Sequence, residues 1–318
     1  MSVAHNLHRR LNLNLFSPIS ELPKRLHERD VGDRLPPHPG RKPGAGGFAG
    51  LHIVTLLQLL VLAVVQGITE FLPISSSGHL VLTSQLMGWP DQGLIIDIAV
   101  HAGTLLAVIL YFWRDIWMIV AGTASALTGR PAPGFKLLVF VVIATVPIVA
   151  AGYFGLSYIK TVARSIELIA WTTLGFGILL GVVDWLCMTV RRMEHLTYLG
   201  VIFIGCAQAL ALLPGTSRAG ITMTACRALG MERREAARFS MLLSIPAILG
   251  ATTLASLELY ESGNVALSMD AAIAAALAFV TALIAIAAMM QWLMRATFTP
   301  FVIYRIVLGG GLLYWVYS

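Results

Sequence analysis

The chain has 318 residues and a formal net charge of +6, and it is 57% hydrophobic but only 12% charged. A soluble domain usually carries about twice that charged fraction, so this composition excludes an ordinary water-soluble fold. We expect an all-α polytopic membrane protein, because helices satisfy their own backbone polar groups within a bilayer. No basic surface for nucleic acid is expected, since most of the positive excess lies in the first fifty residues.

Residues 1–50 are rich in proline, glycine and arginine and contain eight Lys/Arg against four Asp/Glu. Such a segment cannot bury enough apolar surface to fold, so we expect a disordered basic N-terminal tail. A cleaved signal peptide is not expected, because no apolar stretch follows Arg9 and Arg10 before Leu51. A wrongly assigned start codon is an open alternative for this segment.

After residue 50 the chain becomes apolar. A helix needs about 20 residues to cross the hydrocarbon core of a bilayer. Six segments reach that length and are predicted to be transmembrane helices: 93–113, 135–158, 165–188, 232–258, 268–292 and 299–317.

Two other stretches, 51–88 and 195–229, begin as apolar segments, break at a cluster of Pro, Ser and Gly, and then resume as helices. Each half is too short to cross a bilayer alone. Backbone that is not helical survives at membrane depth only where protein buries it or where it lines a wet cavity. Both stretches are therefore predicted to be re-entrant helix–loop–helix hairpins.

The two hairpins also match each other at one constant offset along the sequence. The matched pairs are Gln66 with Gln208, Ser75 with Ser217, Gly78 with Gly220, and Gly88 with Gly230. Three spans follow each hairpin, and an odd number of spans makes the second copy enter from the opposite face. We therefore predict an inverted-topology repeat, 51–188 and 195–317, whose broken helices meet near the midplane.

Basic residues flank the second hairpin, which places its base in the cytoplasm by the positive-inside rule. These residues are Arg191, Arg192, Arg227, Arg233, Arg234 and Arg238. The loop 259–267 carries no Lys or Arg and is expected outside, so the first hairpin is expected to enter from outside. Lys160, Arg164 and the basic tail disagree with this orientation.

The first hairpin contains Gln66, Glu70, Pro73, Ser75, Ser76, Ser77, Gly78 and His79. Gln66 and Glu70 are four residues apart, so they share one helix face, and Pro73 ends that helix. Serine is a preferred residue at a helix start, where free backbone N–H groups favour an anion. This hairpin therefore offers a carboxylate, hydroxyls and an imidazole around one anion-binding helix start.

The second hairpin contains Pro214, Gly215, Thr216, Ser217, Arg218, Ala219 and Gly220. It again offers hydroxyls and glycines at a helix start, and Arg218 adds a guanidinium suited to gripping phosphate oxygens. An arginine at membrane depth costs about 2.5–3.5 kcal/mol on insertion scales, which favours a partner or a substrate for it.

Structural interpretations of the same residues stay open. Glu70 could serve only to pair with Arg218, the serines could only make hydrogen bonds within the bundle, and His79 could be a satisfied buried histidine. The convergence of these groups on two matching breaks favours a site instead. Asp97 and His101 are four residues apart on the next helix, and they either pair with each other or support that site.

At these residues the chain resembles the undecaprenyl-diphosphatase family, also called BacA or bacitracin-resistance proteins. One family motif is a Glu/Gln-x-x-x-Glu helix leading into Pro-x-Ser-Ser-x-Gly-His, which appears here as residues 66–79. The other is a Pro-Gly-x-Ser-Arg-Ser-Gly loop, which appears as residues 214–220. Two positions matter for the comparison: Gln66 lacks the carboxylate that the motif also allows, and Ala219 replaces the usual serine.

The resemblance implies a phosphatase domain over residues 51–318 that hydrolyses undecaprenyl diphosphate to the monophosphate and phosphate. That step recycles the lipid carrier for the cell wall and confers bacitracin resistance. The predicted catalytic residues are Glu70, Ser76, His79 and Arg218. The predicted substrate-binding residues are Gln66, Ser75, Ser77, Gly78, Gly215, Thr216 and Ser217. A divalent cation, Mg²⁺ or Ca²⁺, is expected as cofactor, with Glu70 as its ligand.

The same resemblance implies a multi-pass protein of the bacterial inner membrane whose site opens to the periplasm. Its expected partners are the polyprenyl diphosphate lipid and the bilayer, and a homodimer is left open. Inverted repeats with broken helices are also a transporter architecture, so a polyprenyl-phosphate flippase is the alternative function.

Overall fold

The computed structural model describes residues 55–89, 93–130, 132–162, 165–187, 189–261 and 269–318. The whole predicted N-terminal tail, 1–50, and most of the predicted outside loop 259–267 therefore lie outside the described residues. Within the described ranges every regular element is a helix, and the one β-bridge, between Arg191 and Met231, is isolated.

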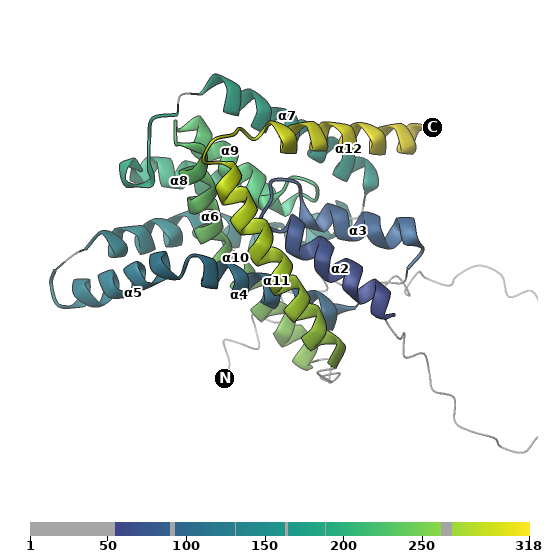
Figure 1. Ribbon diagram of the computed structural model, residues 1–318, viewed down its shortest axis with the longest axis horizontal. Helices are drawn as coiled ribbons and strands as arrows, with labels where there is room; N and C mark the ends of the chain where they lie inside the picture. Colours follow the sequence, from purple (N-terminus) through teal and green to yellow (C-terminus); the bar gives the residue numbers. More distant parts are fainter. Residues whose placement is uncertain (1–54, 90–92, 131, 163–164, 188, 262–268) are drawn as a thin grey trace, which may run out of the picture.

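The helices follow one another along the chain as Figure 1 shows. They are α2 (Leu56–Thr69), α3 (Ser76–Met87), α4 (Leu94–Tyr111), α5 (Trp113–Leu127), α6 (Pro133–Val162), α7 (Ile166–Leu186), η1 (Met193–His195), α8 (Tyr198–Ala209), η2 (Leu210–Leu212), α9 (Arg218–Ala228), α10 (Arg233–Glu261), α11 (Met269–Trp292) and α12 (Thr299–Tyr317).

Six of these helices are long and apolar enough to cross a membrane: α4, α6, α7, α10, α11 and α12. They coincide with the six predicted spans, so the prediction of an all-helical multi-pass membrane protein is confirmed. The sequence analysis did not predict α5, which follows α4 after a break at Phe112 and packs against α6. Its 15 residues include charged positions, and a search for membrane-length apolar runs passes over such a helix.

Each of the two stretches predicted to be hairpins contains a broken helix pair, α2–α3 in the first and α8–η2–α9 in the second. The offset that relates the start of α8 to the start of α2 also relates the start of α9 to that of α3. The breaks share an unusual backbone, because Ser75 and Ser217, which immediately precede α3 and α9, have φ of 72° and 68°. A left-handed glycine also follows each second helix, Gly88 with φ 63° directly after α3 and Gly230 with φ 81° two residues after α9. The sequence match at this offset is therefore also a match in local backbone geometry.

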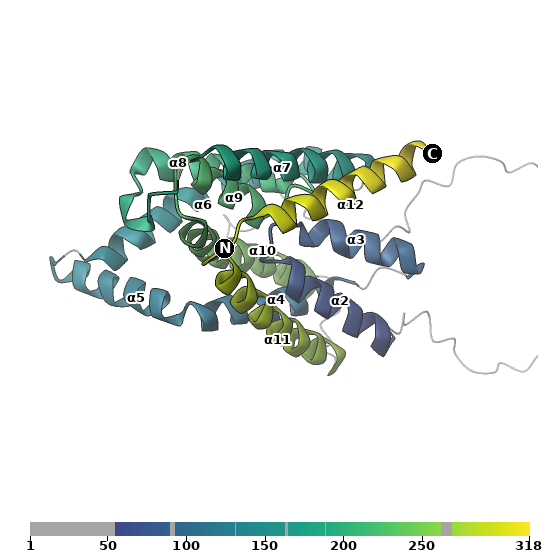
Figure 2. The ribbon, with the colours of Figure 1, turned by 45° about the horizontal axis from the view of Figure 1, so that its top comes forward.

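The long helices pack against the two broken helix pairs and against one another. Helix α12 lies along α7, and α11 lies against α2 and α4 (Figures 1 and 2). Helices α6 and α9 both contact α8, and α10 contacts α4 and α9. The α2–α11 contact is close at Gly67, where an added Cβ would overlap the side chain of Thr281. Small residues at such crossings let membrane helices approach each other.

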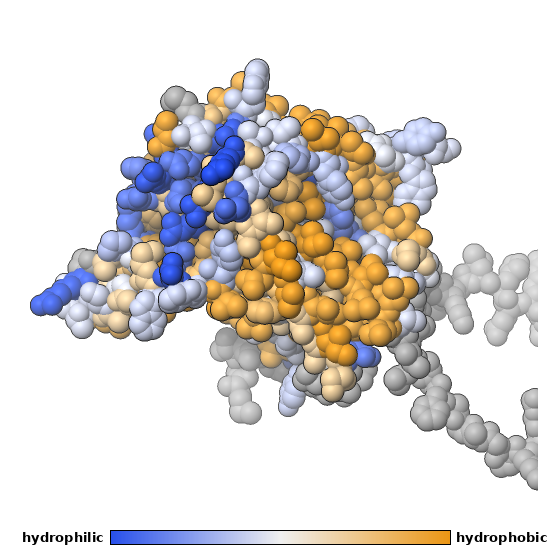
Figure 3. Space-filling view, viewed as in Figure 1, coloured by the Kyte–Doolittle hydropathy of each residue, from blue (hydrophilic) through white to orange (hydrophobic). Residues whose placement is uncertain are grey.

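Basic residues gather where the ends of four helices meet. Buried Asp184, at the end of α7, accepts 2.8 Å hydrogen bonds from Arg227 of α9 and Arg233 of α10, and also a bond from the backbone N–H of Phe298 beside α12. Hydrophilic side chains also surround the turn from α11 to α12, next to a broad hydrophobic area over α11 (Figure 3). The basic positions from the sequence analysis thus cluster at one end of the bundle.

Candidate functional site

Glu70 is the centre of the site, at the C-terminal end of α2. Its Oε2 accepts hydrogen bonds from Gln66 Nε2 at 3.0 Å and from Ser76 Oγ at 2.7 Å. Its Oε1 accepts a bond from Arg218 Nη2 at 3.1 Å, although the two residues are far apart in the sequence. The structure therefore joins the predicted acid, hydroxyl and guanidinium in one contact network between the two breaks.

Arg218 is the first residue of α9, and its side chain is 13% exposed, against 8% for Glu70. Its Nη1 makes one long bond of 3.5 Å to the carbonyl of Ser240. A guanidinium has five N–H donors, and the remaining ones bond to no described residue. Arg218 can therefore keep its contact with Glu70 and still donate to a phosphate.

The starts of α3 and α9 differ in capping. The Ser217 hydroxyl accepts a bond from the N–H of Gly220 at 3.1 Å and so caps α9. Ser75 makes no such bond at the start of α3, where its hydroxyl lies 3.4 Å from that of Ser77. The first N–H groups of a helix have no intrahelical partner, so those of α3 are available to an anion beside Ser76. Ser77 is exposed and Ser76 is half-buried, so this helix start is also accessible.

The half-buried His79 is held at both ring nitrogens. Its Nδ1 lies 2.6 Å from the backbone carbonyl of Ser75, and its Nε2 lies 2.6 Å from the hydroxyl of Tyr304 on α12. The Ser76 hydroxyl donates to Glu70 instead of to the imidazole. In this arrangement Glu70, and not His79, is the proton acceptor in contact with Ser76.

Arg305 of α12 is a central residue that the sequence analysis missed. Its side chain is fully buried and donates to carbonyls of both breaks: to Pro73 at 3.2 Å, Gly215 at 3.0 Å and Thr216 at 2.9 Å. It also bonds to the carbonyls of Thr172 and Thr173 on α7. The available signal was a lone arginine inside a span, which the cost of burying a charge already marks as functional or structural.

The loop residues of the second break are buried, as the matching residues 73–75 of the first break also are. Gly215, Thr216 and Ser217 are all buried, and the first two turn their carbonyls to Arg305. Gly215 has φ 86°, and an added Cβ would overlap Thr172 Oγ1, so the turn requires glycine. These residues therefore frame the site through their backbone, and their predicted contacts with substrate stay a prediction.

The sequence is similar to one family of known proteins. The family described as "Bacitracin resistance protein BacA" matches residues 59–311. The chain belongs to this family. Undecaprenyl-diphosphatase 1 of Rhodospirillum rubrum is 53% identical over 265 residues, which cover 81% of this chain and 94% of that protein. The undecaprenyl-diphosphatase of Alcanivorax borkumensis is 49% identical over 260 residues, which cover 81% and 98%. That of Jannaschia sp. is 48% identical over 267 residues, which cover 83% and 100%.

The side-chain oxygens of Glu70 and Gln66 at the site of this BacA-family protein are of the kind that binds a hard cation such as Mg²⁺. The buried Oε1 of Gln66 accepts no hydrogen bond from any described residue, and it belongs to the side chain that contacts Glu70. The described residues contain no group of three His, Cys, Asp or Glu placed to hold a metal. Mg²⁺ is commonly held by one or two carboxylates together with substrate phosphates, and Glu70 with Gln66 fits that pattern.

Asp97 and His101 contact each other through the backbone. The His101 ring nitrogen Nδ1 lies 2.7 Å from the carbonyl oxygen of Asp97, one turn earlier on α4. A role of this pair in supporting the Glu70 site stays a prediction.

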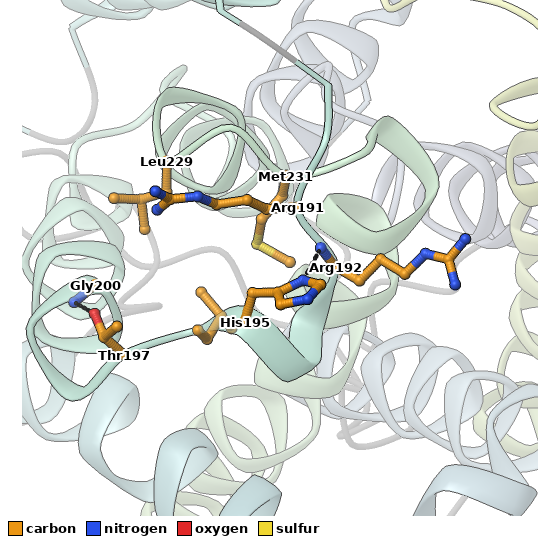
Figure 4. Close-up of a pocket in the computed structure, with 8 residues that line it drawn as sticks. Arg191, Arg192, His195, Thr197, Gly200, Leu229 and Met231 are labelled. Atoms are coloured by element: carbon orange, nitrogen blue, oxygen red, sulfur yellow. Dashed lines mark hydrogen bonds between the residues drawn. The ribbon is translucent and has the colours of Figure 1, made fainter.

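Two other hollows do not serve as alternatives to the Glu70 site of this family member. The pocket of about 20 Å³ shown in Figure 4 lies beside Arg191, Arg192 and His195, and has room for about one water molecule. A larger hollow of about 470 Å³ is lined by apolar side chains, among them Ile68 and Phe301. Ile68 points to the opposite face of α2 from Glu70, because two residues turn a helix by about 200°.

Proposed function

We propose that the protein hydrolyses undecaprenyl diphosphate to undecaprenyl phosphate and inorganic phosphate. The relatives named undecaprenyl-diphosphatase, at 48% to 53% identity across most of the chain, support this activity. The observation that carries it is the contact of Glu70 with both Ser76 and Arg218. In the cell this reaction would recycle the lipid carrier for the cell wall and confer bacitracin resistance.

In this proposal Arg218 and the N–H groups at the start of α3 bind the diphosphate. Arg218 has N–H donors that bond to no described residue, and α3 presents uncapped N–H groups beside Ser76. Donors that are fixed before the reaction stabilise charge as it develops on phosphate oxygens, and this effect supplies most of the catalysis of phosphoryl transfer.

The nucleophile in this proposal is Ser76. Glu70 Oε2, which already accepts its hydrogen bond, takes the hydroxyl proton as Ser76 Oγ bonds to the terminal phosphorus. The bond from that phosphorus to the bridging oxygen breaks, and undecaprenyl phosphate leaves. Water then hydrolyses the phosphoserine, and His79 exchanges a proton in this second step. If Ser76 instead only orients an attacking water, no phosphorylated serine can be trapped.

A divalent cation, Mg²⁺ or Ca²⁺, fits the same site. Glu70 and the unpaired Oε1 of Gln66 would hold it together with the phosphates. When bound, it would neutralise charge on the diphosphate oxygens.

The two broken helix pairs are proposed to be re-entrant hairpins of an inverted-topology repeat. The matched helix starts and matched backbone angles support a repeat. The 11 residues of α9 extend about 16 Å, roughly half of a 30 Å hydrocarbon core, between Arg218 and the basic end of the bundle. With that end in the cytoplasm, the site lies near the midplane of the inner membrane and opens to the periplasm.

Phosphate release from a C55 diphosphate tests this proposal directly. Purified wild type is compared with Glu70→Ala and Arg218→Ala, each with and without a chelator, and Arg295→Ala serves as an exposed-cation control. Both site variants are expected to lose about 10²–10⁴-fold in rate, and chelation is expected to abolish release. Full activity in Arg218→Ala would show that Arg218 does not bind the diphosphate, and it would contradict this mechanism.

A polyprenyl-phosphate flippase is the second candidate function. It is favoured by the two matching breaks, which Arg305 ties together at their carbonyls, because transporters use such paired broken helices. A pure flippase releases no phosphate in detergent, whereas it moves labelled lipid across a reconstituted bilayer. The two assays on the same preparation therefore separate the candidates.

A further inference from the structure

Tyr304 contacts His79 from a distant part of the sequence and belongs to neither motif. Its hydroxyl lies 2.6 Å from His79 Nε2, and the two rings stack with centroids 5.6 Å apart and planes at 14°. Tyr304 directly precedes Arg305 on α12. The same helix therefore carries the arginine that bonds to both breaks and the tyrosine that contacts the imidazole.

The partners of His79 determine which nitrogen carries its proton. The carbonyl of Ser75 can only accept a hydrogen bond, so Nδ1 at 2.6 Å must carry the hydrogen. In a neutral imidazole Nε2 is then an acceptor, and the Tyr304 hydroxyl donates to it. Burial disfavours a positive charge on the imidazole, and the fully buried guanidinium of Arg305 disfavours it further.

We propose that Tyr304 is a positioning residue for the phosphatase reaction. Its hydroxyl holds His79 in the neutral form with the hydrogen on Nδ1, and so sets the pH range in which Nε2 exchanges a proton. This inference rests on the proposed function, because it assigns Tyr304 to the same reaction.

Other charged groups face this region, but they do not replace the Tyr304 contact. Arg305 lies on α12 with Tyr304, while Glu70 at the end of α2 is paired with Arg218 of α9. Among the described residues, Tyr304 is the side chain that forms a hydrogen bond with the imidazole. Removal of its hydroxyl therefore changes the environment of Nε2 without removing a charge.

The test uses Tyr304→Phe, which keeps the stacked ring and removes the donor. The neutral imidazole then loses a stabilising hydrogen bond, so His79 binds a proton more readily. The pH dependence of kcat is expected to shift to higher pH by about 0.5–1 pH unit. We also expect kcat to be several-fold lower and KM to change little. Tyr314→Phe, an exposed tyrosine on the same helix, is the matched control and is expected to leave the profile unchanged.

A second arm does not depend on activity. Protein labelled with ¹⁵N-histidine is titrated by NMR, and the His79 signal is assigned from a His79→Gln variant. An upward shift of the His79 midpoint in Tyr304→Phe supports the proposal even if wild type releases no phosphate, a result that would overturn the proposed function alone. An unchanged midpoint, or a lower melting temperature with an unchanged pH profile, would overturn the role of Tyr304.

Discussion

The two breaks share one backbone but are used differently. Each places a serine with positive φ immediately before its second helix, Ser75 in the first break and Ser217 in the second. The turn residues 73–75 and 215–217 are buried in both breaks. The helix starts differ, because half-buried Ser76 and exposed Ser77 open α3, whereas half-buried Arg218 and buried Ala219 open α9.

The two breaks contribute different groups to the site. The second break contributes Arg218 to the reactive groups, and two of its loop carbonyls bond to Arg305, whereas the first break supplies one such carbonyl, that of Pro73. The first break contributes Glu70 and Ser76 and leaves the start of α3 uncapped. Two copies of one local structure can therefore divide a site between a framework and a reactive face. Three predictions test this division.

The largest effect is expected from Arg305→Leu. Three loop carbonyls and two helix carbonyls of buried residues lose a hydrogen bond at once, so we expect a loss of about 3–5 kcal/mol in the free energy of unfolding. Unfolding in detergent, followed by circular dichroism, measures this loss. Arg295→Leu, which removes an exposed arginine, should change stability by less than about 0.5 kcal/mol. Equal stability of the two variants would show that Arg305 does not clamp the breaks.

Much of this fold could be predicted from length and hydropathy. The six spans follow from apolar runs of membrane length, and the breaks follow from Pro, Ser and Gly within such runs. Helix α5 could not be found in this way, because it is short and carries charges such as Asp115. Its existence depends on packing against α6, which no local pattern records.

A second prediction compares Gly220 and Gly78, which occupy matching positions in the two breaks. An added Cβ at Gly220 would lie 2.9 Å from Arg305 Nη1, so Gly220→Ala should cost about 1–3 kcal/mol by displacing the clamp. At Gly78 the nearest atoms would be 3.5 Å away, which is ordinary contact. Because alanine favours helices by about 1 kcal/mol over glycine, Gly78→Ala should unfold no more easily than wild type.

Activity completes this second prediction. The methyl group of Gly78→Ala would lie 3.5 Å from the Ser75 hydroxyl at the start of α3, so phosphate release per folded molecule should fall while stability is kept. In Gly220→Ala, stability should fall first. The opposite pattern, with Gly220→Ala stable and Gly78→Ala unfolded, would reverse the assignment of framework and reactive face.

The candidate site was only partly predictable. The motifs identified Glu70, Ser76 and Arg218, whose chemistry is visible in the residue types, and the structure brings them into contact. Arg305 and Tyr304 lie far beyond both breaks in the sequence, on an apolar helix, and their partners are backbone carbonyls and one imidazole. A carbonyl exists at every residue, so no sequence pattern could indicate which ones an arginine would bind.

The smallest effect compares the two serines with positive φ. Ser217→Ala removes the hydroxyl that caps α9 at the N–H of Gly220, and it should lower the free energy of unfolding by about 1 kcal/mol. Ser75→Ala removes no cap and should lower it by less than about 0.5 kcal/mol. Glycine variants sharpen the comparison, because glycine also relieves the left-handed backbone by about 1 kcal/mol. Ser75→Gly should therefore stabilise the protein, while the gain in Ser217→Gly should be offset by the lost cap. Equal shifts in unfolding midpoint at both positions would mean that the cap contributes nothing, and that the two breaks differ only in their side-chain chemistry.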